Sequence, residues 1–173
     1  MNLVLIGYRG TGKSVVARIL AQRLGRRVVA LDDEIVRRAG RGIPAIVAAH
    51  GWPHFRDLET EAVREAAARD GLVLDTGGGA IERPANVEAL RRTGRLFWLT
   101  ASVDAIVARI QAGTQRPALT PGKSFTDEVA EVLARRTPLY AAAAHHAIDT
   151  DGRTPAQVAD AILALWQVDT AGG

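Results

Sequence analysis

The chain has 173 residues, of which 47% are hydrophobic and 24% charged, a balance that predicts one globular domain with a substantial core. It contains no cysteine, which excludes disulfides and thiolate metal sites. The net charge is +3, but the arginines are spread along the chain without a basic block, so nucleic acid is not the favoured partner. The chain carries no 18-residue apolar run, and its first strand-like run starts at Leu3, leaving no room for a signal peptide. We therefore expect a cytoplasmic monomer that binds neither membrane nor nucleic acid.

Apolar runs alternate with amphipathic stretches along the chain. The runs predicted as strands are Leu3–Ile6, Val28–Leu31, Leu72–Leu74, Leu96–Leu99 and Ala147–Ile148. The stretches predicted as helices are Ser14–Leu24, Asp33–Ala39, Pro44–Ala49, Pro53–Ala68, Pro84–Arg92, Val103–Gln111, Asp127–Tyr140 and Pro155–Trp166. Ser102, Thr126 and Thr154 are the expected N-caps of the last three helices. Strands that alternate with helices predict an α/β fold with a parallel sheet covered on both faces.

The first predicted strand runs into a glycine-rich segment, Gly7 to Ser14, that reads G-x-x-x-x-G-K-S. A strand before it and a helix after it provide the context that a P-loop requires. Glycines allow successive backbone N–H groups to face an anion, and the following helix points its positive end at the same place. Lys13 is expected to reach the β- and γ-phosphates, and the Ser14 hydroxyl to contact Mg²⁺. The segment predicts a nucleoside triphosphate site.

Three acidic residues follow the second predicted strand, at the sheet edge where α/β proteins bind ligands. Asp33 and Glu34 also suit the first turn of the next helix, where acidic side chains are favoured without any functional role. Asp32 lies at the strand edge in this interpretation. We therefore take Asp32 as the candidate general base or substrate-orienting group.

The segment Phe55 to Glu59 places Arg56 and Glu59 three residues apart, on one face of a predicted helix. Glu59 can hold the guanidinium in one orientation for a ligand. The alternative is an exposed ion pair that contributes only a few tenths of a kcal/mol. The spacing alone does not decide between them.

The third predicted strand is followed by Asp75 and then by three glycines, Gly77 to Gly79. An apolar strand that ends in Asp, with glycine close behind, is similar to a Walker B segment, whose carboxylate lies beside the metal of the P-loop. Three consecutive glycines exceed what a turn needs and offer bare N–H donors to a ligand. We therefore favour a functional role over a plain glycine turn.

The later part of the chain adds cations and a long loop. Residues 113–124 lack periodicity and include Arg116 and Lys123, which suits either a lid or a solvated surface loop. Arg136 lies on a helix just before a proline, and Arg153 follows the last strand. The four histidines are interpreted as structural or surface residues, since Gly51 and Pro53 interrupt the one pair with helical spacing, His50 and His54.

Taken together, these motifs resemble the shikimate kinase family in order and spacing, from Leu3 to about Leu165. The matching motifs are the P-loop, Asp32, the F-R-x-x-E of Phe55–Glu59, the glycines 77–79, Arg116-Pro117, the R-x-P-L-Y of Arg136–Tyr140, and Arg153–Pro155. The resemblance implies a three-layer P-loop kinase fold, with a five-stranded parallel sheet of order 2-3-1-4-5 and a mobile lid. It also implies ATP-dependent phosphorylation of the 3-hydroxyl of shikimate, with Mg²⁺ as the metal. The whole chain, residues 1–173, would form a single kinase domain, with a substrate-binding region at 33–61 and the lid at 112–124.

The resemblance further assigns roles to individual residues. Those implied to contact shikimate are Asp32, Arg56, Glu59, Gly77, Gly78, Gly79 and Arg136. Those implied to contact the nucleotide are Gly10, Thr11, Gly12, Lys13, Ser14, Val15, Arg109, Arg116, Arg153 and Pro155. Lys13, Asp32 and Arg116 are the implied catalytic residues, with Arg116 brought in by the lid.

One position departs from the family pattern. The family usually has D-x-D at the end of the second strand, whereas this chain reads Ala30-Leu31-Asp32. Our hypothesis is that Asp75 supplies the missing carboxylate near Mg²⁺, with Ser14 as its partner; Asp33 is a rival, but alternation along an extended chain would point it away from the side of Asp32. The alternatives to shikimate kinase are a related binding protein with impaired catalysis and a same-fold kinase acting on another small polyol acid.

Overall fold

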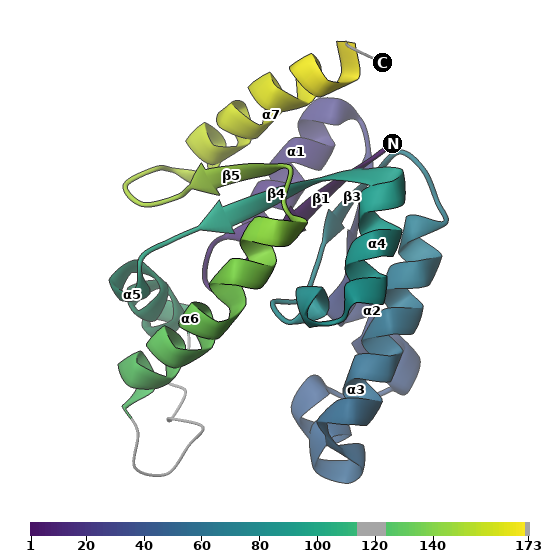
Figure 1. Cartoon of the computed structure of the whole chain (residues 1–173), viewed down its shortest axis with the longest axis vertical. Coiled ribbons are helices and arrows are strands. Elements are labelled where there is room, and N and C mark those ends of the chain that lie inside the picture. The colour runs from purple at the N-terminus through teal and green to yellow at the C-terminus, as the bar shows by residue number, and fades with distance from the viewer. Residues whose placement is uncertain (114–123, 172–173) are drawn as a thin grey trace.

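The computed structural model describes residues 1–113 and 124–171, and in it five strands form one parallel sheet of order β2-β3-β1-β4-β5 (Figure 1). The strands are β1 (Asn2–Ile6), β2 (Arg27–Ala30), β3 (Leu72–Asp75), β4 (Gly94–Thr100) and β5 (His146–Asp149). The expected strand order is thereby confirmed. Most of the predicted lid, with Arg116 and Lys123, lies outside the described residues.

Helices follow nearly every strand. They are α1 (Lys13–Leu24), α2 (Leu31–Ala39), α3 (Ile43–Ala67), the short 3₁₀ helix η1 (Ala80–Glu82), α4 (Pro84–Thr93), α5 (Val103–Gly113), α6 (Phe125–Ala143) and α7 (Pro155–Ala171). The two helices predicted on either side of Gly51 form the single element α3, which is interrupted where Gly51 adopts a φ of 81°. Ser102 and Thr154 cap their helices as expected, but Thr126 is not a cap: the Ser124 hydroxyl accepts from the Asp127 N–H and α6 starts earlier.

The sheet is covered on both faces, because successive side chains of a strand point in opposite directions. Leu3 and Leu5 of β1 pack with α1 and α7 in one hydrophobic cluster. Val4 and Ile6 pack on the opposite face in a second cluster, with side chains of α2, α3, α4 and α6. These three layers are the predicted architecture. Within the described residues, no helix has the length and apolar character needed to cross a bilayer.

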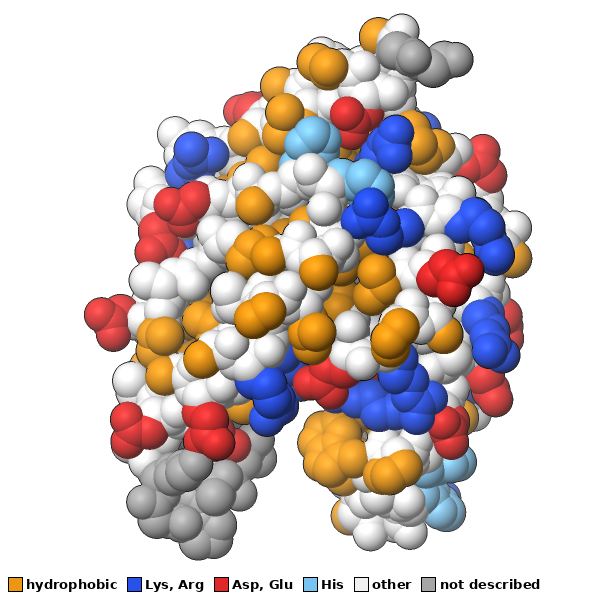
Figure 2. Space-filling model, in the orientation of Figure 1, with side chains coloured by type: hydrophobic (Ala, Val, Ile, Leu, Met, Phe, Trp, Pro, Cys, Tyr) orange, Lys and Arg blue, Asp and Glu red, His pale blue; other side chains and the backbone are white. Residues whose placement is uncertain are grey.

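Parallel strands share one carboxyl edge, and the polar motifs gather there. The P-loop leaves β1, Asp75 ends β3 and Ala30 ends β2 at that edge. The space-filling view shows a hollow at the lower end of the molecule, with basic and acidic side chains beside it (Figure 2). This is the place where an open α/β sheet binds its ligands.

Candidate active site

The P-loop folds as a cradle of backbone amides around the start of α1. Gly10 and Gly12 have φ angles of 79° and 90°, which side-chain-bearing residues rarely adopt. Lys13 is buried, and its Nζ donates to the carbonyl oxygens of Gly7 at 2.7 Å and Tyr8 at 3.1 Å. Burial lowers the pKa of Lys13, while the nearby carboxylates of Asp75 and Asp32 oppose that shift. The lysine is thus held by main-chain oxygens at the place where a phosphate would provide stronger partners.

Ser14 and Asp75 lie together, as the Walker B interpretation predicted. The Ser14 hydroxyl donates to Asp75 Oδ2 at 2.6 Å. The sheet register pairs Asp75 of β3 with Ala30 of the neighbouring strand β2. The Asp75 carboxylate therefore lies directly beside the position where this chain has alanine in place of the family's aspartate. Asp33 lines the same cavity as these three residues. A hydroxyl and carboxylates are the hard oxygen ligands that Mg²⁺ prefers, so these side chains fit that ion.

The prediction that Asp32 lies at the edge of an extended strand is wrong. The residue lies in the first turn of helix α2. Strand β2 ends at Ala30 and the helix begins at Leu31, so the alternation argument used to set Asp33 aside does not apply. The two neighbouring aspartates nevertheless line different cavities. Asp32 Oδ1 is buried and has no hydrogen-bond partner within residues 1–113 and 124–171. Burial raises the pKa of Asp32, Lys13 opposes that shift, and Asp75 adds to it.

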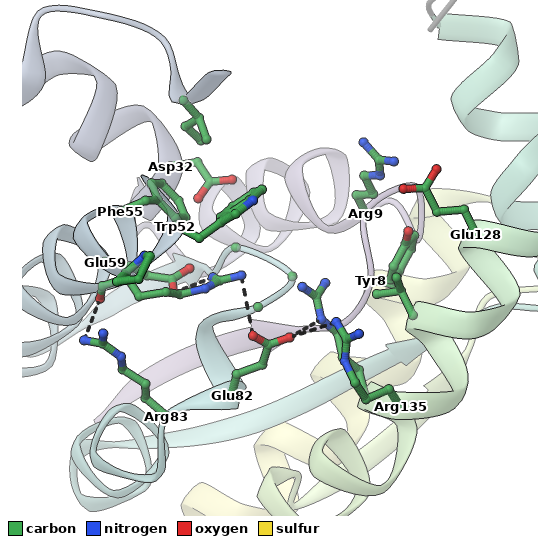
Figure 3. A pocket seen from close by; sticks show the side chains of 18 residues that line it. Tyr8, Arg9, Asp32, Trp52, Phe55, Glu59, Glu82, Arg83, Glu128 and Arg135 are labelled. Atoms are coloured by element: carbon green, nitrogen blue, oxygen red, sulfur yellow. Dashed lines mark hydrogen bonds and ion pairs between the residues drawn. The ribbon is translucent and has the colours of Figure 1, made fainter. Parts of the chain in front are cut away.

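A cavity of about 680 Å³ opens beside Asp32, between α3, η1, α6 and the glycine loop (Figure 3). Arg56 donates through Nη1 to Glu59 Oε2 at 2.7 Å, and their side chains are only 15% and 1% exposed. The exposed ion pair considered as an alternative is therefore wrong. Burial raises the pKa of Glu59, while the Arg56 guanidinium opposes that shift. Glu59 fixes one guanidinium so that its remaining donors face the cavity.

The three glycines after β3 leave space for charged side chains. A Cβ at Gly77 would lie 2.7 Å from Asp32 Oδ1, and one at Gly79 would collide with the Arg56 guanidinium. A Cβ at Gly78 would lie 3.3 Å from Arg136 Nη1. None of the three has a positive φ, so turn geometry does not require glycine here; instead, side chains at these positions would crowd the charged groups of the cavity. The sequence pointed to this loop, but for a different reason.

Arg136 reaches the same cavity from α6 and is held by Glu82. Its Nε donates to Glu82 Oε1 at 2.8 Å. Tyr140, one turn further along α6, donates its hydroxyl to the Gly78 carbonyl and helps to raise the pKa of Arg136. Sequence reasoning missed Glu82, as well as Arg9, which also lines the cavity. Glu82 lies in no motif, and Arg9 occupies a variable position of the P-loop, so neither residue type is specified by the patterns used above.

The predicted nucleotide residues are only partly brought together. Arg109 donates to the carbonyls of Gly10 at 3.3 Å and Thr150 at 3.1 Å, and so joins the P-loop to the loop after β5. Arg153 lies exposed on that second loop, Pro155 is exposed at the start of α7, and Val15 is exposed on α1. These three side chains are therefore open to solvent.

The histidines have structural partners, as expected. His145 accepts a hydrogen bond at Nδ1 from the Leu96 N–H, and His146 pairs with Asp169 at 2.9 Å. The rings of His50 and His54 do approach one another, with centroids 4.8 Å apart. However, no cluster of three potential metal-ligating side chains from His, Cys, Asp and Glu occurs within the described part of the chain.

Fold and site together define a P-loop phosphotransferase with an arginine-rich cavity beside the P-loop. A family model described as Shikimate kinase matches residues 9–167. A shikimate kinase of Nitratidesulfovibrio vulgaris is 45% identical over 169 residues, covering 95% of this chain and 96% of that protein. One from Symbiobacterium thermophilum is 43% identical over 168 residues, covering 96% and 97%. The solved structure of shikimate kinase from Acinetobacter baumannii in complex with shikimate aligns with a TM-score of 0.90 and 36% identity, covering 97% of this chain and 93% of that one. The chain belongs to the shikimate kinase family.

Proposed function

We propose that this protein transfers the γ-phosphoryl group of ATP to the 3-hydroxyl of shikimate, giving shikimate 3-phosphate and ADP. The observation that carries the proposal is the cavity beside the P-loop, where the guanidiniums of Arg56 and Arg136 converge next to Asp32. Guanidiniums bind carboxylates through paired hydrogen bonds, and an aspartate suits neighbouring hydroxyls, so the cavity fits a small hydroxylated acid. The solved structure of the Acinetobacter baumannii relative is a complex with shikimate, which is an acid of this kind.

Phosphoryl transfer depends on positioning and charge neutralisation more than on covalent chemistry by the protein. Lys13 would exchange its bonds to the Gly7 and Tyr8 carbonyls for phosphate oxygens. Asp32 would orient the attacking hydroxyl and accept its proton, a role suited to a carboxylate whose pKa burial has raised. Gly78 and Gly79 would offer backbone N–H groups to the acceptor, and Arg116 would approach the phosphates.

Ser14 and Asp75 are the residues proposed to hold Mg²⁺, with Asp75 replacing the carboxylate missing at position 30. The 2.6 Å hydrogen bond between them and the register of Asp75 with Ala30 support this assignment. When bound, the ion would neutralise charge on the β- and γ-phosphates. Asp33 is the competing candidate, because it lines the same cavity.

A coupled assay of ADP release tests the function directly. We expect turnover with shikimate and far slower turnover with quinate, gluconate and nucleoside monophosphates, each offered at saturating ATP and Mg²⁺. Preference for another acid would identify a same-fold kinase with a different acceptor. No turnover with any acceptor would favour a binding protein whose catalysis is impaired. The alanine at position 30, in place of the family's aspartate, would then be the first candidate cause.

A further inference from the structure

Glu82 is a pocket carboxylate that the proposed reaction does not use. It ends the short helix η1, and its N–H donates to the Gly79 carbonyl at 3.0 Å. The next residue, Arg83, donates to the Arg56 carbonyl at 3.0 Å and so fastens this turn to α3. The backbone beneath Glu82 is therefore fixed, and its side chain projects into the cavity, where it is 29% exposed (Figure 3).

The two oxygens of Glu82 are divided between the two guanidiniums proposed to bind the acceptor. Oε1 accepts from Arg136 Nε at 2.8 Å, while Oε2 lies 3.7 Å from Arg56 Nη2. Arg135 approaches Oε1 at 3.7 Å from the exposed side of α6. A carboxylate that bridges Arg56 and Arg136 is the arrangement expected of the bound acceptor, and here the protein provides such a carboxylate itself.

Arg56 does not depend on Glu82 for its orientation, whereas Arg136 has Glu82 as its hydrogen-bonded carboxylate. Arg56 is held by Glu59 at 2.7 Å, and its 3.7 Å approach to Glu82 is too long for a hydrogen bond. Each guanidinium thus has a carboxylate partner before any acceptor arrives, and a further carboxylate must share these cations with Glu82 and be repelled by it.

We propose that Glu82 competes with the acceptor's carboxylate for Arg56 and Arg136 and thereby lowers the affinity of the pocket for an acidic acceptor. The proposal rests on the proposed function for the nature of the acceptor. It makes Glu82 a determinant of acceptor affinity that acts through charge. The residue would keep the two cations neutralised in the empty pocket and would weaken the hold on an acid once it is bound.

The test measures the Kd of shikimate by calorimetry for the wild type and for Glu82→Gln, which keeps an oxygen acceptor for Arg136 and removes the charge. We expect the Kd to fall roughly three- to tenfold. The methyl ester of shikimate lacks the competing charge, so its Kd should be the same for both proteins. Glu88→Gln, an exposed change on α4 with the same loss of charge, is the matched control and should leave both Kd values unchanged.

Three results would contradict the proposed competition between Glu82 and the acceptor's carboxylate. A Kd for shikimate that is unchanged or higher in Glu82→Gln overturns the inference, because the residue would then only support Arg136. An equal fall for the acid and the ester also overturns it, since the effect would not involve the acceptor's carboxylate. Absence of shikimate turnover by the wild type in the ADP assay contradicts the proposed function and the inference with it, whereas turnover with an unaltered Kd contradicts the inference alone.

Discussion

The acceptor pocket and the phosphate site neutralise their charges in different ways. In the pocket, guanidiniums are paired with carboxylates, as in Arg56 with Glu59 and Arg136 with Glu82. In the P-loop, the buried Lys13 is bonded to main-chain carbonyls, although carboxylates lie within electrostatic reach. The pocket is therefore arranged by side-chain ion pairs before ligand arrives, whereas the lysine must exchange partners when phosphate binds. Substitutions in the pocket should change acceptor binding, and those in the P-loop should change the rate of transfer.

Asp32 lies where the two regions meet, and its replacement should have the largest effect. Asp32→Asn removes the proposed proton acceptor and should lower kcat by between about 10² and 10⁴-fold. In the wild type, the raised pKa of Asp32 should place the acidic limb of the kcat/KM profile above the range of an ordinary aspartate, with activity rising as pH rises. Asp104→Asn, an exposed aspartate of α5, should leave the profile unchanged. If Asp32→Asn kept the acidic limb of the wild type, the role of Asp32 as proton acceptor would be contradicted.

The same substitution should stabilise the protein. A carboxyl whose folded pKa is raised above its unfolded value reduces stability at neutral pH, and that penalty disappears as pH falls below the unfolded pKa. Asp32→Asn removes the penalty, so we expect its free energy of unfolding at pH 7 to rise by about 1 kcal/mol. The gain should vanish near pH 3 in denaturant titrations. Equal stability of the two proteins at pH 7 would show that the carboxylate is well solvated or paired.

Lys13→Met tests the phosphate site alone. The substitution removes a cation aimed at the transferred group and should lower kcat by about 10²- to 10³-fold. Methionine is apolar and of similar length, and the lysine's charge is already disfavoured by burial, so thermal unfolding should show no loss of stability. The Kd of shikimate, measured without nucleotide, should be unchanged. A weakened shikimate Kd would mean that the two regions are not separable.

Local spacing explains which of these features the sequence predicted. The P-loop and the Arg56–Glu59 pair depend on residues close in the chain, so the sequence pointed to both, but the spacing could not show that the pair is buried. The helical placement of Asp32 was missed because the N-cap of α2 is Ala30, whose methyl group cannot accept a capping hydrogen bond. The sequence therefore carries no capping signal at this boundary. The role of Glu82 was missed because Arg136 is 54 residues away and only the packing of η1 against α6 brings them together.

Arg136→Ala tests the pocket with a neighbour as control. The loss should appear mainly as a higher KM for shikimate and a kcat/KM lower by about 30- to 100-fold, because the acceptor's carboxylate loses a partly buried, hydrogen-bonded cation. Arg135 has a side chain that is 62% exposed and lies 3.7 Å from Glu82. Arg135→Ala should therefore change KM less than threefold. Equal effects of the two substitutions would indicate a general field of positive charge and not a specific contact.

Asp75→Asn should have the smallest effect and bears on the metal side of the phosphate site. The asparagine oxygen can still accept from Ser14, so the variant removes charge while keeping the hydrogen bond seen at 2.6 Å. If Asp75 supports Mg²⁺, the concentration of Mg²⁺ that gives half-maximal rate should rise about tenfold at fixed ATP, as is typical when a supporting carboxylate is lost. Asp33→Asn makes the same change in charge within the same cavity and should shift the midpoint less. An unchanged Mg²⁺ requirement in Asp75→Asn would refute the assignment, and a larger shift in Asp33→Asn would transfer the role to the first turn of α2.

Asp75→Asn should also change the pH dependence of the reaction. Because Asp75 raises the pKa of Asp32, its replacement should move the acidic limb of the kcat/KM profile to lower pH. Such a shift would show that the proposed metal side and the pocket are electrostatically coupled.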